Sequence, residues 1–237
     1  MDIRQVAQYL HMDVREARKL ASRGQMPCRK VAGHFRFTKG DVDHWVETRM
    51  HKLKPNRLAQ IEKGVSDHHG FDAGEMLLLR LIPEGGLAVP LVAKTREATI
   101  RGLVALADRS GVIVGPESRS HLLDEVRGRE ELCSTALMPG VALPHPRHPL
   151  EYDISRSFVV GGLTPAGIPF GATDGTLTRL FFLICCKDDR THLHVLARLA
   201  QMLQTPGVKD DLMSAATPDE FLAIVRRCES RHAGIAS

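Results

Sequence analysis

The sequence predicts an α/β protein in two parts, a small helix-turn-helix unit with a β-hairpin followed by a larger layered domain. Charge is distributed unevenly, because residues 1–63 carry 14 Lys and Arg against 7 Asp and Glu, while residues 64–237 carry 18 against 21. The first fifty residues contain two helix caps and a hairpin turn in close succession. From about Met76 onward, helical and strand patterns alternate, which is typical of α/β layers.

Composition places the chain among ordinary globular proteins. Its 237 residues are 43% hydrophobic and 25% charged. It contains no apolar run of about 18 residues and its N-terminus lacks the pattern of a signal peptide, so we expect a cytoplasmic protein without membrane insertion. The five cysteines are odd in number and show no C-x-x-C spacing, which indicates free thiols.

Two short helices are expected at the N-terminus. Asp2 with Gln5 forms a capping-box pattern for the first, and Asp13 with Glu16 does so for the second, which runs to about Arg23. The apolar residues that we expect to face inward are Val6, Ala7, Leu10, Val14, Ala17, Leu20 and Ala21.

A hairpin and a third helix follow. The stretch "CRKVAGHFRF" alternates around a turn at Ala32-Gly33, and Thr38 with Asp41 opens a helix whose apolar side carries Val42, Trp45 and Val46. Basic side chains on the second helix and the hairpin are suited to neutralising phosphates, and these candidate DNA contacts are Arg15, Arg18, Lys19, Arg23, Arg29, Lys30, His34 and Arg36.

Residues 1–50 resemble the excisionase-type winged helix-turn-helix, a minimal relative of the MerR DNA-binding domain. The resemblance implies DNA as a partner and a homodimer, because one recognition helix makes few base contacts. A small helical module that docks on protein is the alternative. Residues 51–75 are predicted to be a linker with a short polar helix around residues 57–63.

The larger domain is predicted to contain at least four helices and two strands. The segments "SRSFVVGGL" and "TRLFFLICC" are rich in β-forming residues. The helical segments are "TREATIRGLVALADRSG", "SRSHLLDEVRGREELC" with a cap near Ser118 or Ser120, "DRTHLHVLARLAQMLQ", and "TPDEFLAIVRRCES" with Thr217 as its cap.

Three polar clusters stand out against these elements, namely "RGREELCST", "VALPHPRHP" and "THLHVLARL". In the second, Pro144 and Pro146 restrict the backbone on both sides of His145. In the third, His192 and His194 are two residues apart on a helix and do not share a face. Only one of that pair is therefore expected to point at a site.

In this order and spacing, the clusters resemble the enzyme IIA domain of the fructose, mannitol and nitrogen-regulatory branch of the bacterial phosphotransferase system. That family has an Arg-Glu pair followed by Ser-Thr, then G-V-A-hydrophobic-P-H, then H-L-x-x-L at the head of a later helix. The resemblance covers residues 76–229 and leaves a tail at 230–237. It implies an α/β sandwich with a mixed, roughly five-stranded sheet flanked by helices.

The resemblance also implies roles for individual residues. His145 would be phosphorylated by a histidine-containing phosphocarrier protein, His192 would be the second histidine of the site and Arg129 would orient the phosphate. Ser134 and Thr135 would be nearby hydroxyl donors, with Glu130 a structural partner in the same turn. The chemistry agrees, because a neutral imidazole can attack phosphorus and an Arg fork matches phosphate oxygens.

Together these patterns predict a phosphotransferase-linked regulator that accepts phosphate on His145 and couples it to DNA binding, in sugar transport or nitrogen regulation. The alternatives are a phosphocarrier that passes phosphate to a sugar permease and an unphosphorylated interaction module. The H-P-R-H and H-L-H spacings can also ligate metal, but no Cys pair or H-E-x-x-H accompanies them, and we expect no metal. Without G-x-x-x-x-G-K or G-x-G-x-x-G, we expect no nucleotide cofactor.

Overall fold

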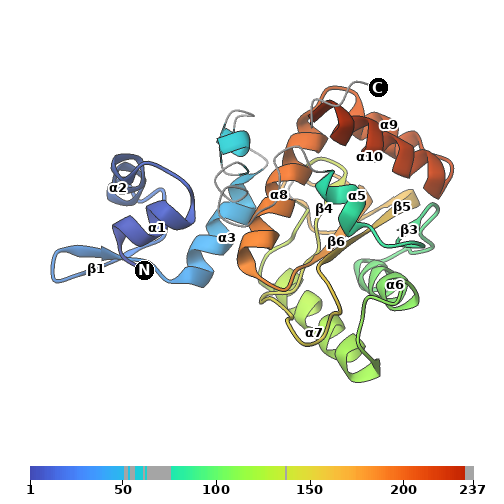
Figure 1. Ribbon diagram of the computed structural model, residues 1–237, viewed down its shortest axis with the longest axis horizontal. Helices are drawn as coiled ribbons and strands as arrows, with labels where there is room; N and C mark the ends of the chain where they lie inside the picture. Colours follow the sequence, from blue (N-terminus) through green and yellow to red (C-terminus); the bar gives the residue numbers. More distant parts are fainter. Residues whose placement is uncertain (51–52, 54–56, 61, 63–75, 137, 233–237) are drawn as a thin grey trace.

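The computed structural model describes residues 1–50, 53, 57–60, 62, 76–136 and 138–232, and most of the expected linker and the last five residues lie outside this part. A small N-terminal unit stands beside a larger α/β domain, and helix α3 lies between them against helix α8 (Figure 1). Residues 57–60 and 62, where a short polar helix is predicted, are helical. None of the helices in the described ranges is long and apolar enough to cross a bilayer.

The N-terminal unit has the predicted order of elements. Asp2 forms the capping box of the first helix, and the Asp13 side chain caps the second. Ala32 and Gly33 have φ angles of 48° and 78°, the left-handed values that a two-residue hairpin turn requires. The elements are α1 (Ile3–Tyr9), α2 (Val14–Ser22), β1 (Arg29–Val31), β2 (His34–Arg36) and α3 (Lys39–Met50).

One inward-facing residue is predicted wrongly in this unit. Val14 is exposed, whereas Ala17 and Ala21 of the same helix are buried. Val14 is the first residue of α2 and lies almost one turn before the small residues that form the buried side of the helix. Its hydrophobic character therefore gives no information about the packing at that end.

A four-stranded mixed sheet forms the centre of the larger domain in the described residues. The strand order is β3-β5-β6-β4, with β5 and β6 antiparallel and both edge strands parallel to their neighbours. The two predicted strands are the long central pair, while the two edge strands have two residues each, too short to show a pattern. The strands are β3 (Leu87–Ala88), β4 (Val141–Ala142), β5 (Phe158–Ile168) and β6 (Thr178–Cys185).

Helices cover both faces of this sheet. Alternate residues of β6 belong to two separate buried clusters, Leu180, Phe182 and Ile184 on one face and Phe181 and Leu183 on the other. This alternation is the period of two that a strand imposes. The helices are α5 (Leu77–Leu81), α6 (Arg96–Arg109), α7 (Pro116–Leu132), α8 (Asp189–Gln204), α9 (Val208–Ser214) and α10 (Pro218–His232).

The start of α7 differs from the prediction. The helix begins at Pro116 with Gly115 at the N-cap, rather than near Ser118 or Ser120. Proline is well suited to the first helical position because its missing N–H has no partner there in any helix. Arg129 and Glu130, which belong to the candidate site, lie near the other end of α7 and are helical in the prediction as well as in the structure.

Helix α3 packs on the larger domain as well as on its own unit. Val42 and Val46 are buried, and Met50 belongs to the same buried cluster as Leu196 and Ala200 of α8. At the other end of α3, Lys39 Nζ lies 2.6 Å from Asp189 at the start of α8. The two units therefore share one continuous apolar core, so they are joined by packing as well as by the chain between them.

Candidate functional site

The backbone just before His145 is held by the loop that follows α7 and by strand β6. His145 follows β4 by three residues; the Leu143 amide donates to the Thr135 carbonyl at 3.1 Å, and the Ile184 amide donates to the Pro144 carbonyl at 2.9 Å. His145 Nδ1 lies 2.7 Å from the Leu143 carbonyl oxygen, which favours a proton on Nδ1. The lone pair is then on Nε2, which faces the cluster described next.

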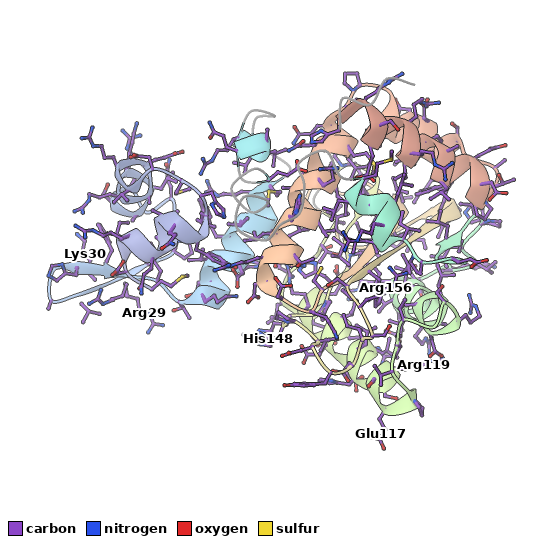
Figure 2. The ribbon with its side chains drawn as sticks, viewed as in Figure 1. Arg29, Lys30, Glu117, Arg119, His148 and Arg156 are labelled. Atoms are coloured by element: carbon purple, nitrogen blue, oxygen red, sulfur yellow. The ribbon has the colours of Figure 1, made fainter. Side chains whose placement is uncertain are left out.

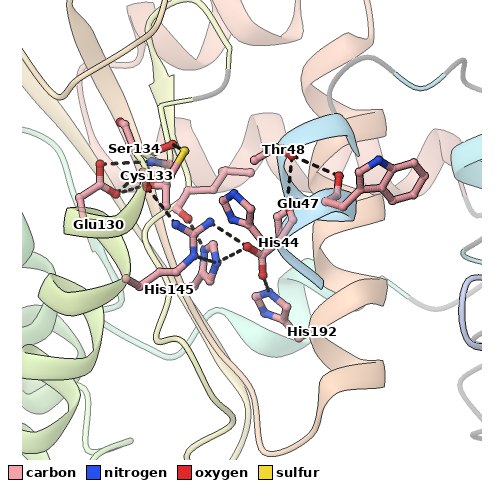
Figure 3. Close-up of polar contacts among 12 residues, drawn as sticks. His44, Glu47, Thr48, Glu130, Cys133, Ser134, His145 and His192 are labelled. Carbon is pink, nitrogen blue, oxygen red and sulfur yellow. Dashed lines mark hydrogen bonds and ion pairs between the residues drawn. The ribbon is translucent and has the colours of Figure 1, made fainter. Parts of the chain in front are cut away.

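Arg129, near the end of α7, joins three groups through its guanidinium (Figure 3). Its Nε donates to His145 Nε2 at 3.2 Å, and one terminal nitrogen donates to the Cys133 carbonyl at 2.9 Å. The other terminal nitrogen donates to a carboxylate oxygen of Glu47 at 2.7 Å. Arg129 is buried, so its planar fork is oriented by fixed partners rather than by solvent.

The two histidines of α8 point to different places. His192 Nε2 lies 3.5 Å from Glu47, and its ring centre is 4.9 Å from that of His145. His194 is buried and its Nε2 lies 3.3 Å from a carboxylate oxygen of Glu62. Of the two, His192 is therefore the one that the structure brings to His145.

Glu47 is the member of the cluster that sequence patterns do not predict. It comes from α3 of the N-terminal unit, yet its carboxylate contacts Arg129, His145 and His192, with 3.2 Å between its oxygen and His145 Nε2. Only 8% of Glu47 is exposed. No local pattern reveals this role, because Arg129 lies 82 positions along the chain.

The two expected hydroxyl donors are turned toward other partners. Ser134 Oγ donates to the Phe170 carbonyl at 2.9 Å, and Thr135 Oγ1 donates to the Glu130 carboxylate at 2.6 Å. Glu130 also accepts from the Thr135 amide, so it organises this turn. In this structure the turn supports Arg129 through the Cys133 carbonyl and does not offer its hydroxyls to His145.

Burial and charge together set the ionisation of the cluster. Burial lowers the pKa of His145, and the adjacent Glu47 carboxylate offsets this only in part. Burial alone would raise the pKa of Glu47, but the contacts with His145 and His192 outweigh it and hold that pKa well below its usual range. Glu47 is therefore an anion, and the Arg129 guanidinium is the cation that lies beside it.

Three side chains of the cluster are of types that bind metal ions. One ligand atom each of Glu47, His145 and His192 lie within 4.8 Å of one another, and two imidazoles with a carboxylate are common zinc ligands. Arg129 lies among the same atoms, however, and a guanidinium repels a divalent cation. The chemistry of the four groups together fits an oxyanion better than a metal ion.

The candidate DNA contacts form a second, separate surface. Arg29 and Lys30 lie on strand β1 of the hairpin, which points away from the larger domain (Figure 2). The eight predicted side chains are all exposed, namely Arg15, Arg18, Lys19, Arg23, Arg29, Lys30, His34 and Arg36. The contact between α3 and α8 therefore leaves this basic surface open to solvent.

Comparison with known families agrees with both parts of the chain. Residues 81–228 match the family described as "Phosphoenolpyruvate-dependent sugar phosphotransferase system, EIIA 2". Residues 1–50 match a family described as "Helix-turn-helix domain". The first match covers more than half of the chain.

Similar proteins include short ones, of which this chain covers about two thirds, and much longer ones. The mannitol-specific phosphotransferase enzyme IIA component of Geobacillus stearothermophilus is 28% identical over 103 residues, 44% of this chain and 69% of that protein. The nitrogen regulatory protein of Klebsiella oxytoca is 28% identical over 113 residues, 47% and 68% of the two chains. Other relatives are longer, and this chain spans 23% of the fructose-specific EIIABC component of Bacillus subtilis.

Solved structures show the same fold for the larger domain. Nitrogen regulatory protein IIA-Ntr from Neisseria meningitidis superimposes with a TM-score of 0.54 at 24% identity, covering 63% of this chain and 99% of that one. Mannitol enzyme IIA from Escherichia coli gives 0.52 at 24% identity, with 60% and 96% coverage. Neither likeness extends over the whole of this chain.

Proposed function

The chain belongs to the EIIA 2 family of the phosphoenolpyruvate-dependent sugar phosphotransferase system, and on that premise we propose that it accepts a phosphoryl group on His145 and couples this event to DNA binding. The observation that carries the proposal is the buried His145 Nε2 with the Arg129 guanidinium beside it. The helix-turn-helix match at residues 1–50 supports DNA as the target of the coupling.

The proposed donor is a histidine-containing phosphocarrier protein. The lone pair of His145 Nε2 attacks the phosphorus of the donor's phosphohistidine, and a new P–N bond forms. The electrons of the broken P–N bond return to the donor ring, which leaves as a neutral imidazole because its other nitrogen carries a proton. The proton on Nδ1 stays on His145, where the Leu143 carbonyl accepts its hydrogen bond. Because no proton has to leave His145, the reaction needs no separate base.

Two further side chains complete the proposed site. Arg129 has donors on one edge for the transferred oxygens, since a guanidinium fork binds phosphate as readily as carboxylate. His192 is close enough to add a donor from the other side. Preorganised donors of this kind stabilise the charge that spreads over the phosphoryl oxygens during transfer.

Phosphorylation of the full chain tests the first half of the proposal. Incubation with the phosphorylated carrier protein is expected to add acid-labile phosphate, located at His145 by mass spectrometry, and His145→Ala is expected to abolish it. His148→Ala is the matched control, because His148 is exposed three residues along the chain and is expected to leave the labelling unchanged. Labelling of His145→Ala at the wild-type level would refute the assignment.

DNA binding tests the second half. We propose that two copies of the chain read half-sites roughly 34–36 Å apart, since a single small recognition unit has little base-reading surface. Joint replacement of Arg18, Lys19 and Arg36 by alanine is expected to weaken DNA binding. It should also reduce the slope of the logarithm of the binding constant against the logarithm of salt concentration by about three. Replacing Arg226, Arg227 and Arg231 of α10 removes equal charge from the other end of the protein and is the control. Equal losses for both triple variants would argue against the proposed surface, and no DNA binding by any protein would favour the phosphocarrier alternative.

A further inference from the structure

The position of Glu47 has a consequence for phosphorylation itself. The carboxylate oxygen lies 3.2 Å from His145 Nε2 and 2.7 Å from a terminal nitrogen of Arg129. A phosphoryl group bonded to Nε2 needs this same space for its phosphorus and oxygens, and it needs the same guanidinium donors. Glu47 thus occupies the place of a phosphoryl group, with a side chain of the same sign of charge.

Access to His145 is closed in the same arrangement. His145 is 2% exposed, and Figure 3 shows Glu47 on α3 facing the imidazoles of His145 and His192. A donor protein must bring a phosphohistidine into line with Nε2, from the side where α3 lies. Because α3 also packs on α8 through Met50 and through the Lys39–Asp189 ion pair, Glu47 cannot withdraw far while α3 stays docked.

After transfer, a phosphoryl group on His145 would oppose the docking of Glu47. A phosphorylated side chain carries a charge of about −1.5 to −2, which would meet the Glu47 carboxylate in a buried site. The docked carboxylate is compensated by Arg129, and the phosphoryl group would take over that donor. The return of α3 would then leave a buried anion without its cation.

We infer that the phosphoacceptor face is also the docking surface of the chain's own helix-turn-helix unit, with Glu47 as an internal substitute for the phosphoryl group, so that docking of α3 and phosphorylation of His145 exclude each other. This inference builds on the proposed function, whose coupling it explains. The docked, unphosphorylated form holds the basic surface in one orientation relative to the larger domain. The phosphorylated form releases it, which changes the geometry of any paired DNA-binding units.

The docking part is tested without a phosphate donor. Diethyl pyrocarbonate modifies accessible neutral imidazoles, and mass spectrometry of peptides gives the rate at His145. Glu47→Gln keeps the size of the side chain and removes its charge, so the undocked form becomes populated. We expect the rate of His145 modification to rise tenfold or more. If roughly 99% of the wild-type protein is docked, complete undocking would raise this rate by up to about a hundredfold. Asp41→Asn removes one charge from an exposed position of the same helix and is expected to behave as wild type.

The exclusion part is tested with the phosphorylated carrier and by small-angle scattering. Glu47→Gln is expected to accept phosphate about tenfold faster than wild type, and Glu47→Asp, which retains the charge, to lie between them. Phosphorylation is expected to increase the radius of gyration of wild type toward the value of unphosphorylated Glu47→Gln. Circular dichroism confirms that each variant is folded.

The outcomes separate this inference from the proposed function. If Glu47→Gln is folded and His145 is modified at the wild-type rate, docking through Glu47 is wrong. If modification rises but neither protein accepts phosphate, the docking surface stands and the proposed phosphorylation fails. If both proteins accept phosphate at one rate, and scattering does not change on phosphorylation, the exclusion is overturned while the proposed function remains.

Discussion

Replacing Arg198 by alanine is expected to lower the free energy of unfolding by about 3–5 kcal/mol, the cost of breaking a buried ion pair from one side. Arg198 of α8 is 2% exposed and pairs with Glu62 and with Glu229, at 3.0 Å from the latter. Glu229 in turn accepts hydrogen bonds from the Leu78 and Leu79 amides, at 2.9 Å each. Without the guanidinium, two buried carboxylates lose this cation, and Glu229, which supports the start of α5, loses one of its partners.

Arg227→Ala is the matched control, because Arg227 on α10 pairs with Asp211 at the surface, where both side chains are about half exposed. Exposed pairs contribute about 0–1 kcal/mol, so this variant is expected to unfold near the wild-type denaturant concentration. Urea titrations followed by circular dichroism measure both. A loss below about 1 kcal/mol for Arg198→Ala would mean that the buried carboxylates find other compensation.

The same network predicts how acid acts on stability. Burial alone would raise the pKa of Glu62, but contacts with His194, His232 and Arg198 prevail and hold that pKa below its ordinary value. A depressed folded-state pKa means that the stabilisation is present above the unfolded value of about 4.3 and is lost as pH falls from there. In Arg198→Ala the pKa of Glu62 rises toward the unfolded value, so this variant is expected to lose less stability over that acid range than wild type.

Local patterns predict much of this fold because local chemistry determines the elements concerned. The capping box at Asp2 and the left-handed turn at Ala32-Gly33 involve residues at most three positions apart, and both are present as predicted. The long central strands β5 and β6 are identified by their runs of β-forming residues. The edge strands β3 and β4 are too short to show a period, and their pairing depends on the long strands already being in place.

The site is predictable only in part, for a related reason. The resemblance to enzyme IIA domains identifies His145, His192 and Arg129, which the structure brings together. It contains nothing about Glu47, because that residue belongs to the other unit and becomes part of the site only when α3 docks. The buried network of Arg198 cannot be predicted from local sequence patterns either, since Glu62 is 136 positions away in the chain. Charges buried by long-range packing leave no periodic pattern.

Replacing Arg129 by alanine is expected to slow phosphotransfer to His145 by about 10²–10³-fold, the usual effect of removing one preorganised donor from the charge that develops in a transition state. Arg129→Lys keeps the charge but not the fork that joins His145, Cys133 and the incoming oxygens, and it is expected to lie between alanine and wild type. Arg127→Ala is the control on the same helix, because Arg127 pairs with Glu97 and Asp124 away from the site.

Because Arg129 also binds Glu47, its loss would open the site while it weakens catalysis, and the two effects oppose each other in the wild-type background. The transfer rates are therefore best compared in Glu47→Gln, where docking through the carboxylate is already removed. In Glu47→Gln, Arg129→Ala is expected to lower the phosphotransfer rate by the full factor given above. In the wild-type background the measured decrease should be smaller, because removing Arg129 also makes His145 more accessible. Equal losses in the two backgrounds would mean that Glu47 does not restrict access. An Arg129→Ala variant that transfers at the wild-type rate in both backgrounds would place the guanidinium outside the reaction.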